Sequence, residues 1–296
     1  MTNNYSGCPL SKLHDSLDKS ERFSPVGIEQ IFTKEGIKYF HCLDCDFVFS
    51  KPSSNANFQN AIEDFEPAYI TYLKWSTADE ENYATLLRLI QKSHPIKEKK
   101  ILDIGSGSGK FVRFLRRNNI EAYGIEPSWA LYSAFLQKDP FFFPMSIKEY
   151  EENLVAGKCD VIFANDVIEH VNNPDQFFEC IANIIESGGV LFISTCDLGS
   201  LVCRITGKRW HYFNKYHLSY FSEETITKLA ERYGFQIMSI SRPFRFKSVG
   251  YIFQYINDFI FAGKKINFFE RFNKFYIPVN IYDYMFIAFK KQNKED

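Results

Sequence analysis

From Lys99 to the end of the chain, segments with the hydrophobic spacing of a β-strand take turns with segments that have the spacing of an amphipathic helix. This pattern predicts strands that alternate with helices. The predicted strands are Lys100–Ile104, Ala122–Ile125, Phe141–Phe143, Val161–Asn165, Val190–Ser194, Gln236–Ile240 and Met285–Phe289. The predicted helices are Lys110–Arg117, Trp129–Lys138, Pro174–Glu186 and Glu223–Tyr233. Repeated strand–helix units indicate an α/β fold with a doubly wound, mostly parallel sheet of seven strands. Ligands of such sheets bind outside the carboxyl ends of the strands.

Local signals mark the ends of the two later helices. Asn173 is a capping residue, and Pro174 behind it suits a first helical turn. The glycine pair at positions 188–189 is expected to end that helix. Ser222 is expected to cap the helix that begins at Glu223.

Three stretches fall outside the alternation. Residues 1–60 are polar with short alternating runs, which predicts a small β-rich module ahead of a main domain at 61–296. A helix is expected from about Glu63 to Lys92. Residues 198–221 and 243–284 are aromatic and partly basic, and both follow late strands. We therefore expect them to be insertions that contact the substrate.

Composition narrows the class of protein. The 35 Lys and Arg against 36 Asp and Glu leave a net charge of -1, which argues against a nucleic-acid partner. The start of the chain lacks the layout of a signal peptide, and no apolar run reaches the roughly 18–20 residues that span a bilayer. The 7 cysteines, an odd number, suit reduced thiols in the cytoplasm. The 31 Phe and 17 Tyr leave room for a ring-rich substrate pocket beside the core.

A glycine-rich turn, Asp103-Ile-Gly-Ser-Gly-Ser-Gly109, joins the first strand of the main domain to its helix. Its glycines let the backbone approach a ligand, and the helix start offers free N–H groups. Glu126 ends the next strand, where a carboxylate can accept hydrogen bonds from two ribose hydroxyls. A dinucleotide site would need glycine at Lys110, and a phosphate loop would need wider glycine spacing and Ser or Thr at Phe111. The alternative is a turn that serves only the fold.

With these residues the chain resembles the class I S-adenosylmethionine-dependent methyltransferases over about residues 63–296. The matching segments are Asp103–Gly109, Tyr123–Ser128, Asp160–Pro174 and Ser187–Thr195. The finer resemblance is to the branch of ubiquinone-pathway O-methyltransferases and bacterial sugar and secondary-metabolite methyltransferases. It lies in the Glu-His-Val-x-x-Pro run and in a later segment, Gly207–Ser222. The resemblance implies a Rossmann-like methyltransferase fold.

The resemblance also implies S-adenosyl-L-methionine as cofactor. It assigns the ribose to Glu126, the adenine to residues 127–129 and 146–147, and the surroundings of the sulfonium to Asn165 and Asp166. Tyr69 matches a tyrosine-bearing stretch that closes over the cofactor. The residues implied to contact the cofactor are Asp103, Gly105, Ser106, Gly107, Gly109, Glu126, Pro127, Ser128, Trp129, Ser146, Ile147, Asn165, Asp166 and Tyr69.

Methyl transfer from a sulfonium is a direct displacement, so alignment carries most of the catalysis and a base helps a hydroxyl acceptor. His170 is the first candidate base because histidine titrates near neutral pH; the alternative is that its ring fixes the loop before Pro174. Glu169 beside it could help to hold a divalent cation, although no third ligand is visible in the sequence. His211 and His217 are further catalytic candidates.

The segment around these two histidines suits a flat or sugar-like acceptor with a negative group. Trp210, Tyr212 and Tyr216 are its candidate substrate residues, and the alternative is an aromatic insertion that packs on the sheet edge.

The amino-terminal region contains half of a metal knuckle, Cys42-Leu-Asp-Cys45. Sugar methyltransferases that resemble this chain often carry a small zinc ribbon with the pattern Cys-Pro-x-Cys…Cys-x-x-Cys. Here the first pair reads Cys8-Pro-Leu-Ser11, so a fourth ligand is missing unless His14 or His41 supplies it. The candidate metal ligands are Cys8, Cys42 and Cys45, and the alternative is a ribbon that has lost its metal.

Residues 251–274 combine an apolar face with basic neighbours, which suits peripheral contact with a membrane; the alternative is a helix that packs on the core or in a dimer. Taken together, the sequence predicts a cytoplasmic methyltransferase that acts on a hydroxyl of a sugar or another small metabolite. Two other hypotheses stay open, a non-catalytic cofactor-binding partner subunit and a methyltransferase for protein or RNA.

Overall fold

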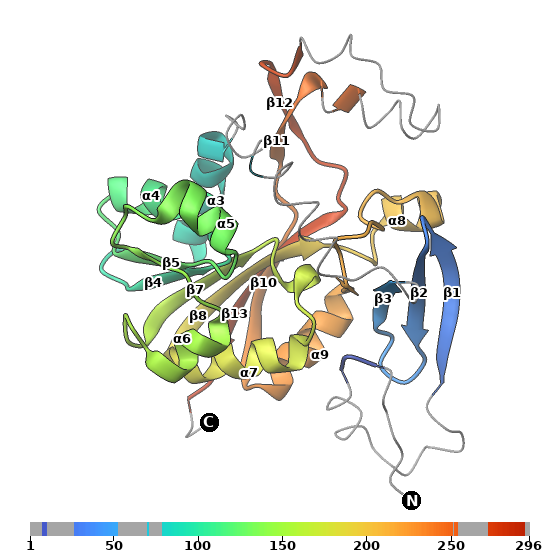
Figure 1. Ribbon diagram of the computed structural model, residues 1–296, viewed down its shortest axis with the longest axis horizontal. Coiled ribbons are helices and arrows are strands. Elements are labelled where there is room, and N and C mark those ends of the chain that lie inside the picture. The colour runs from blue at the N-terminus through green and yellow to red at the C-terminus, as the bar shows by residue number, and fades with distance from the viewer. Residues whose placement is uncertain are drawn as a thin grey trace, which may run out of the picture.

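The computed structural model of the chain describes residues 8–10, 27–52, 70, 79–250, 252–253 and 272–293. Its centre is a sheet in the order β10-β13-β8-β7-β4-β5-β6 (Figure 1). The strands are β4 (Ile101–Ile104), β5 (Ala122–Ile125), β6 (Phe142–Phe143), β7 (Cys159–Asn165), β8 (Ile185–Cys196), β10 (Phe235–Ser241) and β13 (Tyr284–Lys291). Only β13 runs antiparallel to both of its neighbours. The predicted seven-stranded, mostly parallel sheet is confirmed.

Helices cover both faces of this sheet because its strands are apolar on both sides. In β7, Ile162 packs in one core cluster with Tyr150, while the adjacent Phe163 packs in another with Phe111. One face carries α3 (Asp79–Ser93), α4 (Lys110–Arg117) and the short α5 (Trp129–Leu131), and the other carries α6 (Ile147–Asn153), α7 (Pro174–Ile184) and α9 (Glu223–Arg232) (Figure 1).

The carboxyl end of α7 corrects one expectation. The helix ends at Ile184 and β8 begins at Ile185, so the prediction that the glycine pair 188–189 ends the helix is wrong. Both isoleucines are buried, and the chain therefore passes directly from the helix into the sheet. A Cβ at Gly189 would lie 2.8 Å from main-chain oxygen atoms. The glycine thus allows close approach within the sheet instead of ending a helix.

Two other predicted helices differ in extent. The helix expected over Trp129–Lys138 is a single α turn followed by the π-helix η2 (Tyr132–Leu136). The guanidinium of Arg113, which does not belong to η2, donates a hydrogen bond to the carbonyl of Phe135 within η2. Of the helix expected over residues 63–92, the structure describes α3 from Asp79, and most of the stretch before it lies outside the described residues.

A second sheet has the order β1-β2-β3-β9 and lies beside the main domain (Figure 1). Its first three strands, β1 (Ile28–Lys34), β2 (Ile37–Cys42) and β3 (Val48–Pro52), form the expected amino-terminal β-rich module. Its fourth strand, β9 (Ser219–Tyr220), comes from the main part of the chain. The predicted domain boundary near residue 60 lies outside the described residues.

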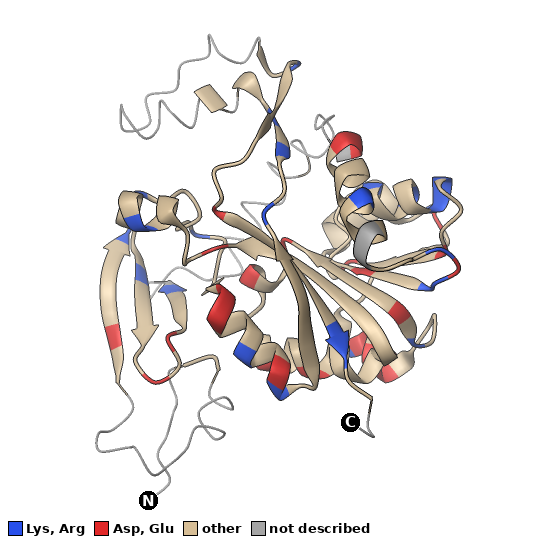
Figure 2. Cartoon of the chain, turned by 180° about the vertical axis from the view of Figure 1, so that it is seen from behind, with Lys and Arg blue, Asp and Glu red and all other residues tan. Residues whose placement is uncertain are grey.

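The late stretches contain short elements. Helix α8 (Leu201–Thr206) lies in the first, and a ribbon of β11 (Arg245–Ser248) and β12 (Tyr276–Val279) projects from the sheet in the second (Figure 1). Most of the predicted membrane-contacting stretch, 251–274, lies outside the described residues. None of the described helices has the length and apolar character needed to cross a membrane. Basic and acidic residues are interspersed over the described elements (Figure 2).

Candidate active site

A cavity of about 630 Å³ lies at the carboxyl ends of β4, β5 and β7, where the fold predicts a ligand. The turns after these strands form its floor. Helix α3, residues 212–217 and the first strand of the ribbon complete its wall. The cavity therefore joins the glycine-rich turn to both late stretches that were expected to contact a substrate.

The glycine-rich turn needs its glycines for two different reasons. Gly105 has a φ of 68°, and a Cβ there would lie 2.8 Å from the Val167 side chain across the cavity wall. Gly107 also has positive φ and lines the cavity. Gly109 does not line it; a Cβ at Gly109 would lie 2.6 Å from the Phe142 ring, so this glycine serves the packing of α4 on the sheet.

Glu126 lies where a ribose carboxylate is expected. It is 5% exposed, and its two oxygens accept hydrogen bonds from the backbone N–H groups of Gly107 at 2.8 Å and Ser128 at 2.9 Å. These bonds hold the carboxylate at the cavity while each oxygen keeps further acceptor capacity. The glycine turn and Glu126 thus form one connected cradle, and this donor and acceptor set fits a nucleoside ligand.

Asp103 forms the inner wall of the same cradle. Its side chain is 4% exposed, and burial together with the charge of Glu126 raises its pKa to about 8. The carboxyl is therefore mostly protonated near neutral pH in the free protein. A cationic group in the cavity would favour its ionised form.

Asn165 and Asp166 end β7 at the cavity, and Asp166 has a φ of 53°. Its carboxylate accepts from the Arg245 guanidinium at 3.0 Å, and that guanidinium lies 4.1 Å from the centre of the Tyr284 ring. Burial opposes ionisation of Asp166, but Arg245 and Lys247 bring its pKa below the usual value. The ribbon is thereby joined to the loop after β7.

Two of the three predicted catalytic histidines meet in the cavity. The rings of His170 and His217 lie 4.9 Å apart, edge to face, and Nδ1 of His170 lies 2.8 Å from the Tyr216 carbonyl. That contact makes Nδ1 the protonated nitrogen and leaves Nε2 as the acceptor. His170 is solvent-exposed on one side, but desolvation by the surrounding residues still lowers its pKa, and burial lowers the pKa of His217 to about 3, so both rings are neutral near pH 7.

His211 and Trp210 lie behind the cavity wall. Trp210 is fully buried, and its indole N–H donates to the Asp283 carboxylate at 3.2 Å. Nδ1 of His211 is 3.7 Å from the same carboxylate, and burial lowers the pKa of His211 to about 4. Neither residue lines the cavity, whereas Tyr212 and Tyr216 do.

The residues implied for the adenine lie in two places. Pro127 and Ser128 line the cavity, but Trp129 is 63% exposed at the start of α5 and does not. Ser146 forms a capping box at the start of α6 with Ile147 behind it, and neither lines the cavity. Tyr69 lies outside the described residues.

Several lining residues were not singled out in the sequence. Helix α3 contributes Asn82 and Tyr83; in the helix predicted over 63–92, only Tyr69 was assigned to the cofactor. Arg245, Lys247 and Tyr284 come from the second late stretch or from its border. That stretch carried a signal as a whole, but the ion pair across 79 positions has none in a single sequence.

Among the residues that the structure describes, two groups of side chains have donor sets suited to a metal ion. Glu169, His170 and His217 each offer a ligand atom, and these atoms lie within 4.8 Å of one another beside the cavity. Glu169 is buried and accepts from the Thr195 hydroxyl at 3.1 Å, and burial with the charge of Asp166 raises its pKa to about 8. His217 thus completes a set of three donors with Glu169 and His170. The sequence did not show that it lies beside them.

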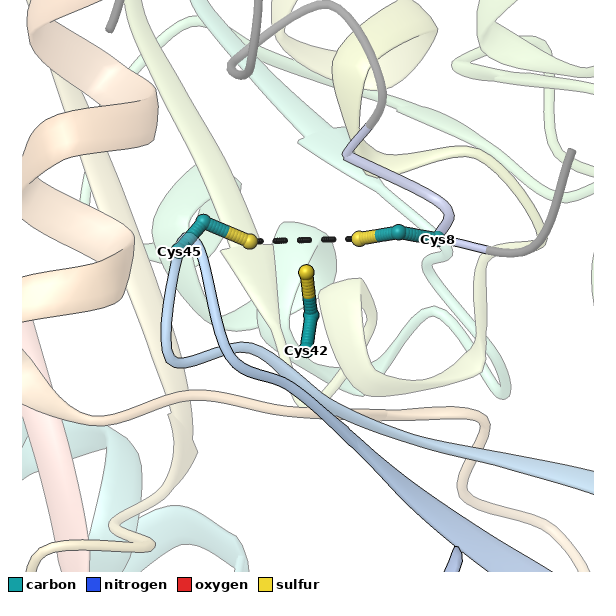
Figure 3. Close-up of side chains that lie close together, drawn as sticks. All are labelled: Cys8, Cys42 and Cys45. Atoms are coloured by element: carbon teal, nitrogen blue, oxygen red, sulfur yellow. Dashed lines mark hydrogen bonds between the residues drawn. The ribbon is translucent and has the colours of Figure 1, made fainter. Parts of the chain in front are cut away.

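The second group consists of Cys8, Cys42 and Cys45, whose sulfur atoms point toward one another (Figure 3). The Sγ atoms of Cys8 and Cys45 are 3.8 Å apart, and all three thiols are buried. Cys8 thus lies beside the C-x-x-C pair although it is 37 positions from Cys45 in the sequence. Convergent sulfur donors of this kind are typical of zinc sites.

Comparison with known proteins places this chain in a family. The sequence model described as a methyltransferase domain matches residues 75–240, more than half of the chain. The mitochondrial ubiquinone biosynthesis O-methyltransferase of Rattus norvegicus is 31% identical over 112 residues, which cover 35% of this chain and 32% of that protein. The ubiquinone biosynthesis O-methyltransferase of Pelagibacter ubique is 28% identical over 156 residues, or 50% of this chain and 62% of that protein.

The tRNA U34 carboxymethyltransferase of Dichelobacter nodosus is 31% identical over 116 residues, which cover 36% of each chain. The matches therefore span less than two thirds of the length of each of these relatives. Among solved structures, a chain in a complex with the Haloferax volcanii Trm112 methyltransferase activator aligns with a TM-score of 0.52 at 12% identity. That alignment covers 77% of this chain and 98% of the other, and it shows a shared fold. The chain therefore belongs to the methyltransferase-domain family, within the class I S-adenosylmethionine-dependent methyltransferases.

Proposed function

We propose that this chain transfers a methyl group from S-adenosyl-L-methionine to a hydroxyl group of a small-molecule acceptor. The observation that carries the proposal is the single cavity that joins the Glu126 cradle to His170 and His217. One ligand held by the cradle would bring its reactive end toward the histidines, because both sets of residues line the same space. The names of the ubiquinone-pathway relatives support transfer to oxygen.

The donor half of the cavity suits this cofactor. Glu126 would bind the ribose hydroxyls, and the backbone from Gly105 to Gly107 would approach the methionine portion. Asp103 and Asp166 would lie near its positive groups. When bound, the cofactor supplies a methyl group on a sulfonium, which is an activated leaving group.

The acceptor half of the cavity contains a candidate base and a wall of aromatic side chains. His170 is neutral, and the Tyr216 carbonyl orients its ring so that Nε2 can take the proton of an acceptor hydroxyl. Tyr212 and Tyr216 offer ring faces on the same wall. Arg245 and Lys247 add positive charge, so a sugar or aromatic ring with an anionic substituent fits this wall best.

Cofactor binding tests the proposal through Glu126. We expect purified protein to bind S-adenosylhomocysteine in calorimetry and Glu126→Gln to weaken that binding by roughly tenfold or more, because it removes a charged acceptor for two hydroxyls. The matched control is Glu152→Gln, an exposed residue on α6. No binding by the wild-type chain, or equal binding by both variants, would contradict the proposal.

We also propose that the thiol cluster of Cys8, Cys42 and Cys45 holds one zinc ion. The support is its geometry, since three buried sulfur atoms converge with no disulfide among them. All seven cysteines are free thiols, which also favours a reducing compartment such as the cytoplasm.

Metal content tests the zinc site directly. We expect about one zinc per chain in protein purified without chelator, and a loss of most of it in Cys45→Ser, because one thiolate of three is removed. Cys180→Ser, a buried thiol of α7 outside the cluster, is the control and should keep its zinc. Wild-type protein that is free of zinc even after reconstitution with the ion would overturn this assignment.

A further inference from the structure

The wall that carries Tyr212, Tyr216 and His217 lies between two parts of the molecule. On one side, the Leu218 N–H donates to the Glu169 carbonyl at 2.7 Å. On the other, the Leu218 carbonyl accepts from the Ser50 N–H at 2.9 Å, next to the pairing of β3 with β9. The amino-terminal sheet thus holds the main chain that follows His217 from the side opposite the cavity loop.

Ser50 reaches His217 itself. Its hydroxyl donates to the His217 carbonyl at 2.7 Å, and the Tyr220 hydroxyl donates to the same oxygen at 3.0 Å. Both Ser50 and His217 are almost fully buried. The histidine backbone is therefore fixed by two hydroxyl groups, one of which comes from β3.

Lys34 holds the other end of the wall. The hairpin of β1 and β2 turns through Glu35 and Gly36, both with positive φ, which places Lys34 at its tip. The Lys34 ammonium donates to the Phe213 carbonyl at 2.7 Å and to the Trp210 carbonyl at 3.3 Å. These two charge-assisted bonds hold main-chain carbonyls on both sides of Tyr212.

Rings fill the space between these polar contacts. Tyr39 of β2 lies 5.1 Å from the Phe213 ring and 5.8 Å from the Tyr220 ring, and Phe32 of β1 lies 4.9 Å from Phe213. Packing alone would only cover apolar surface. Lys34 and Ser50 add directional bonds to main-chain atoms on both sides of Tyr212, Tyr216 and His217.

We infer that the amino-terminal sheet is part of the acceptor site, with Lys34 and Ser50 as positioning residues that set where Tyr212, Tyr216 and His217 stand. The inference rests on the proposed function for the identity of this wall as the acceptor side. It assigns to Lys34 and Ser50 the placement of the acceptor wall, while the donor cradle after β4 and β5 is built without residues 27–52.

Hydrogen exchange on the full chain tests the role of Lys34. We expect Lys34→Met to speed exchange of the amides in residues 207–221 by roughly tenfold, because two carbonyls lose a charged donor. Amides of residues 100–126 should keep their wild-type rates. Lys38→Met is the matched control, since Lys38 is exposed on β2 of the same hairpin. Lys34→Arg keeps the charge and should restore most of the protection.

Nuclear magnetic resonance signals of the histidine rings test the positioning role of Ser50. In protein with ¹⁵N-labelled histidine, we expect Ser50→Ala to shift the ring signals of His217 and His170, and the exposed Ser239→Ala to leave them in place. Calorimetry with S-adenosylhomocysteine should give the wild-type affinity for Lys34→Met and Ser50→Ala.

Unchanged exchange in residues 207–221 and unchanged histidine signals would overturn the inference. Equal loss of protection in residues 100–126 would overturn it as well, because the sheet would then stabilise the whole domain. These readouts need no acceptor and no cofactor turnover. A wild-type chain that fails to bind S-adenosylhomocysteine would contradict the proposed function and would leave the exchange result readable.

Discussion

At the scale of single residues, the candidate site depends on carboxyl groups in unequal surroundings. Asp103 and Glu126 face one cavity, but backbone N–H groups donate to Glu126 while burial raises the pKa of Asp103 to about 8. The folded protein therefore holds a proton on Asp103 near pH 7 that the unfolded chain releases. The same acidic cradle suits a ligand with positive charge.

This proton predicts how stability changes with pH. Between the pKa of an unfolded Asp, about 4, and the folded value of about 8, the folded state binds the extra proton, so the free energy of unfolding falls as pH rises. The contribution is at most about 1.4 kcal/mol per pH unit and ends above pH 8. We expect Asp103→Asn to flatten this decline in urea unfolding at pH 5, 6, 7 and 8. A slope equal to that of the wild type would show that Asp103 does not hold the proton.

The residues of the donor cradle could be predicted from the sequence because they are local. Gly105, Gly107 and Glu126 lie at ends of adjacent parallel strands, and strand order alone brings them together. Arg245 could not be found in this way, since its partner Asp166 is 79 positions away and belongs to another element. His211 was predicted by residue type alone, and its exclusion from the wall depends on packing that has no local pattern.

At the scale of elements, α3 and β11 form part of the cavity wall, and the Asn82 side chain connects them. Asn82 of α3 accepts from the Phe246 N–H at 2.7 Å and donates to the Phe246 carbonyl at 3.3 Å, much as a neighbouring strand would. Helix α3 and β11 both line the cavity. The amide thus holds the ribbon over the ligand site.

Removing this amide should loosen the ribbon. We expect Asn82→Ala to raise the hydrogen-exchange rate of residues 243–250 several-fold, because the main chain of Phe246 loses both partners on α3. Asn172→Ala, in an exposed loop, is the control. Exchange rates that stay the same in Asn82→Ala would mean that the ribbon is held by its other contacts.

Strands were easier to predict than the ends of helices. The predicted Ala122–Ile125 coincides with β5 because an apolar run buried on both faces has one reading. The end of α7 could not be predicted, since Gly188 and Gly189 look like a helix stop and the buried Ile184–Ile185 junction does not. The ribbon was missed because it pairs segments separated by about thirty residues, and each of its strands has only 4 residues.

At the scale of the whole molecule, the main part of the chain supplies the fourth strand of the amino-terminal sheet. β9 pairs with β3 while its neighbours lead directly into α9, and Phe47 and Phe49 pack in the same core cluster as Phe221. The sequence suggested a separate module because its cysteines and alternating runs lie together near one end. Strand β9 has no sequence signal beyond its aromatic residue Tyr220 and the adjacent Phe221.

The common core cluster and the pairing of β9 with β3 predict that the two sheets unfold together. We expect one calorimetric transition for the full chain, with loss of the amino-terminal sheet and of the main sheet at the same temperature. Circular dichroism and hydrogen exchange in residues 27–52 and 185–196 should follow the same curve. Two separated transitions, with residues 27–52 lost first, would contradict this coupling.

The proposed function requires that the cavity after β4, β5 and β7 binds the methyl donor. A crystal structure of the chain grown with S-adenosylhomocysteine tests it most directly. We expect ligand density in that cavity, with the ribose hydroxyls on the Glu126 carboxylate and the amino-acid portion beside Gly105. Density for the ligand elsewhere on the protein, or a ribose bound without Glu126, would contradict it.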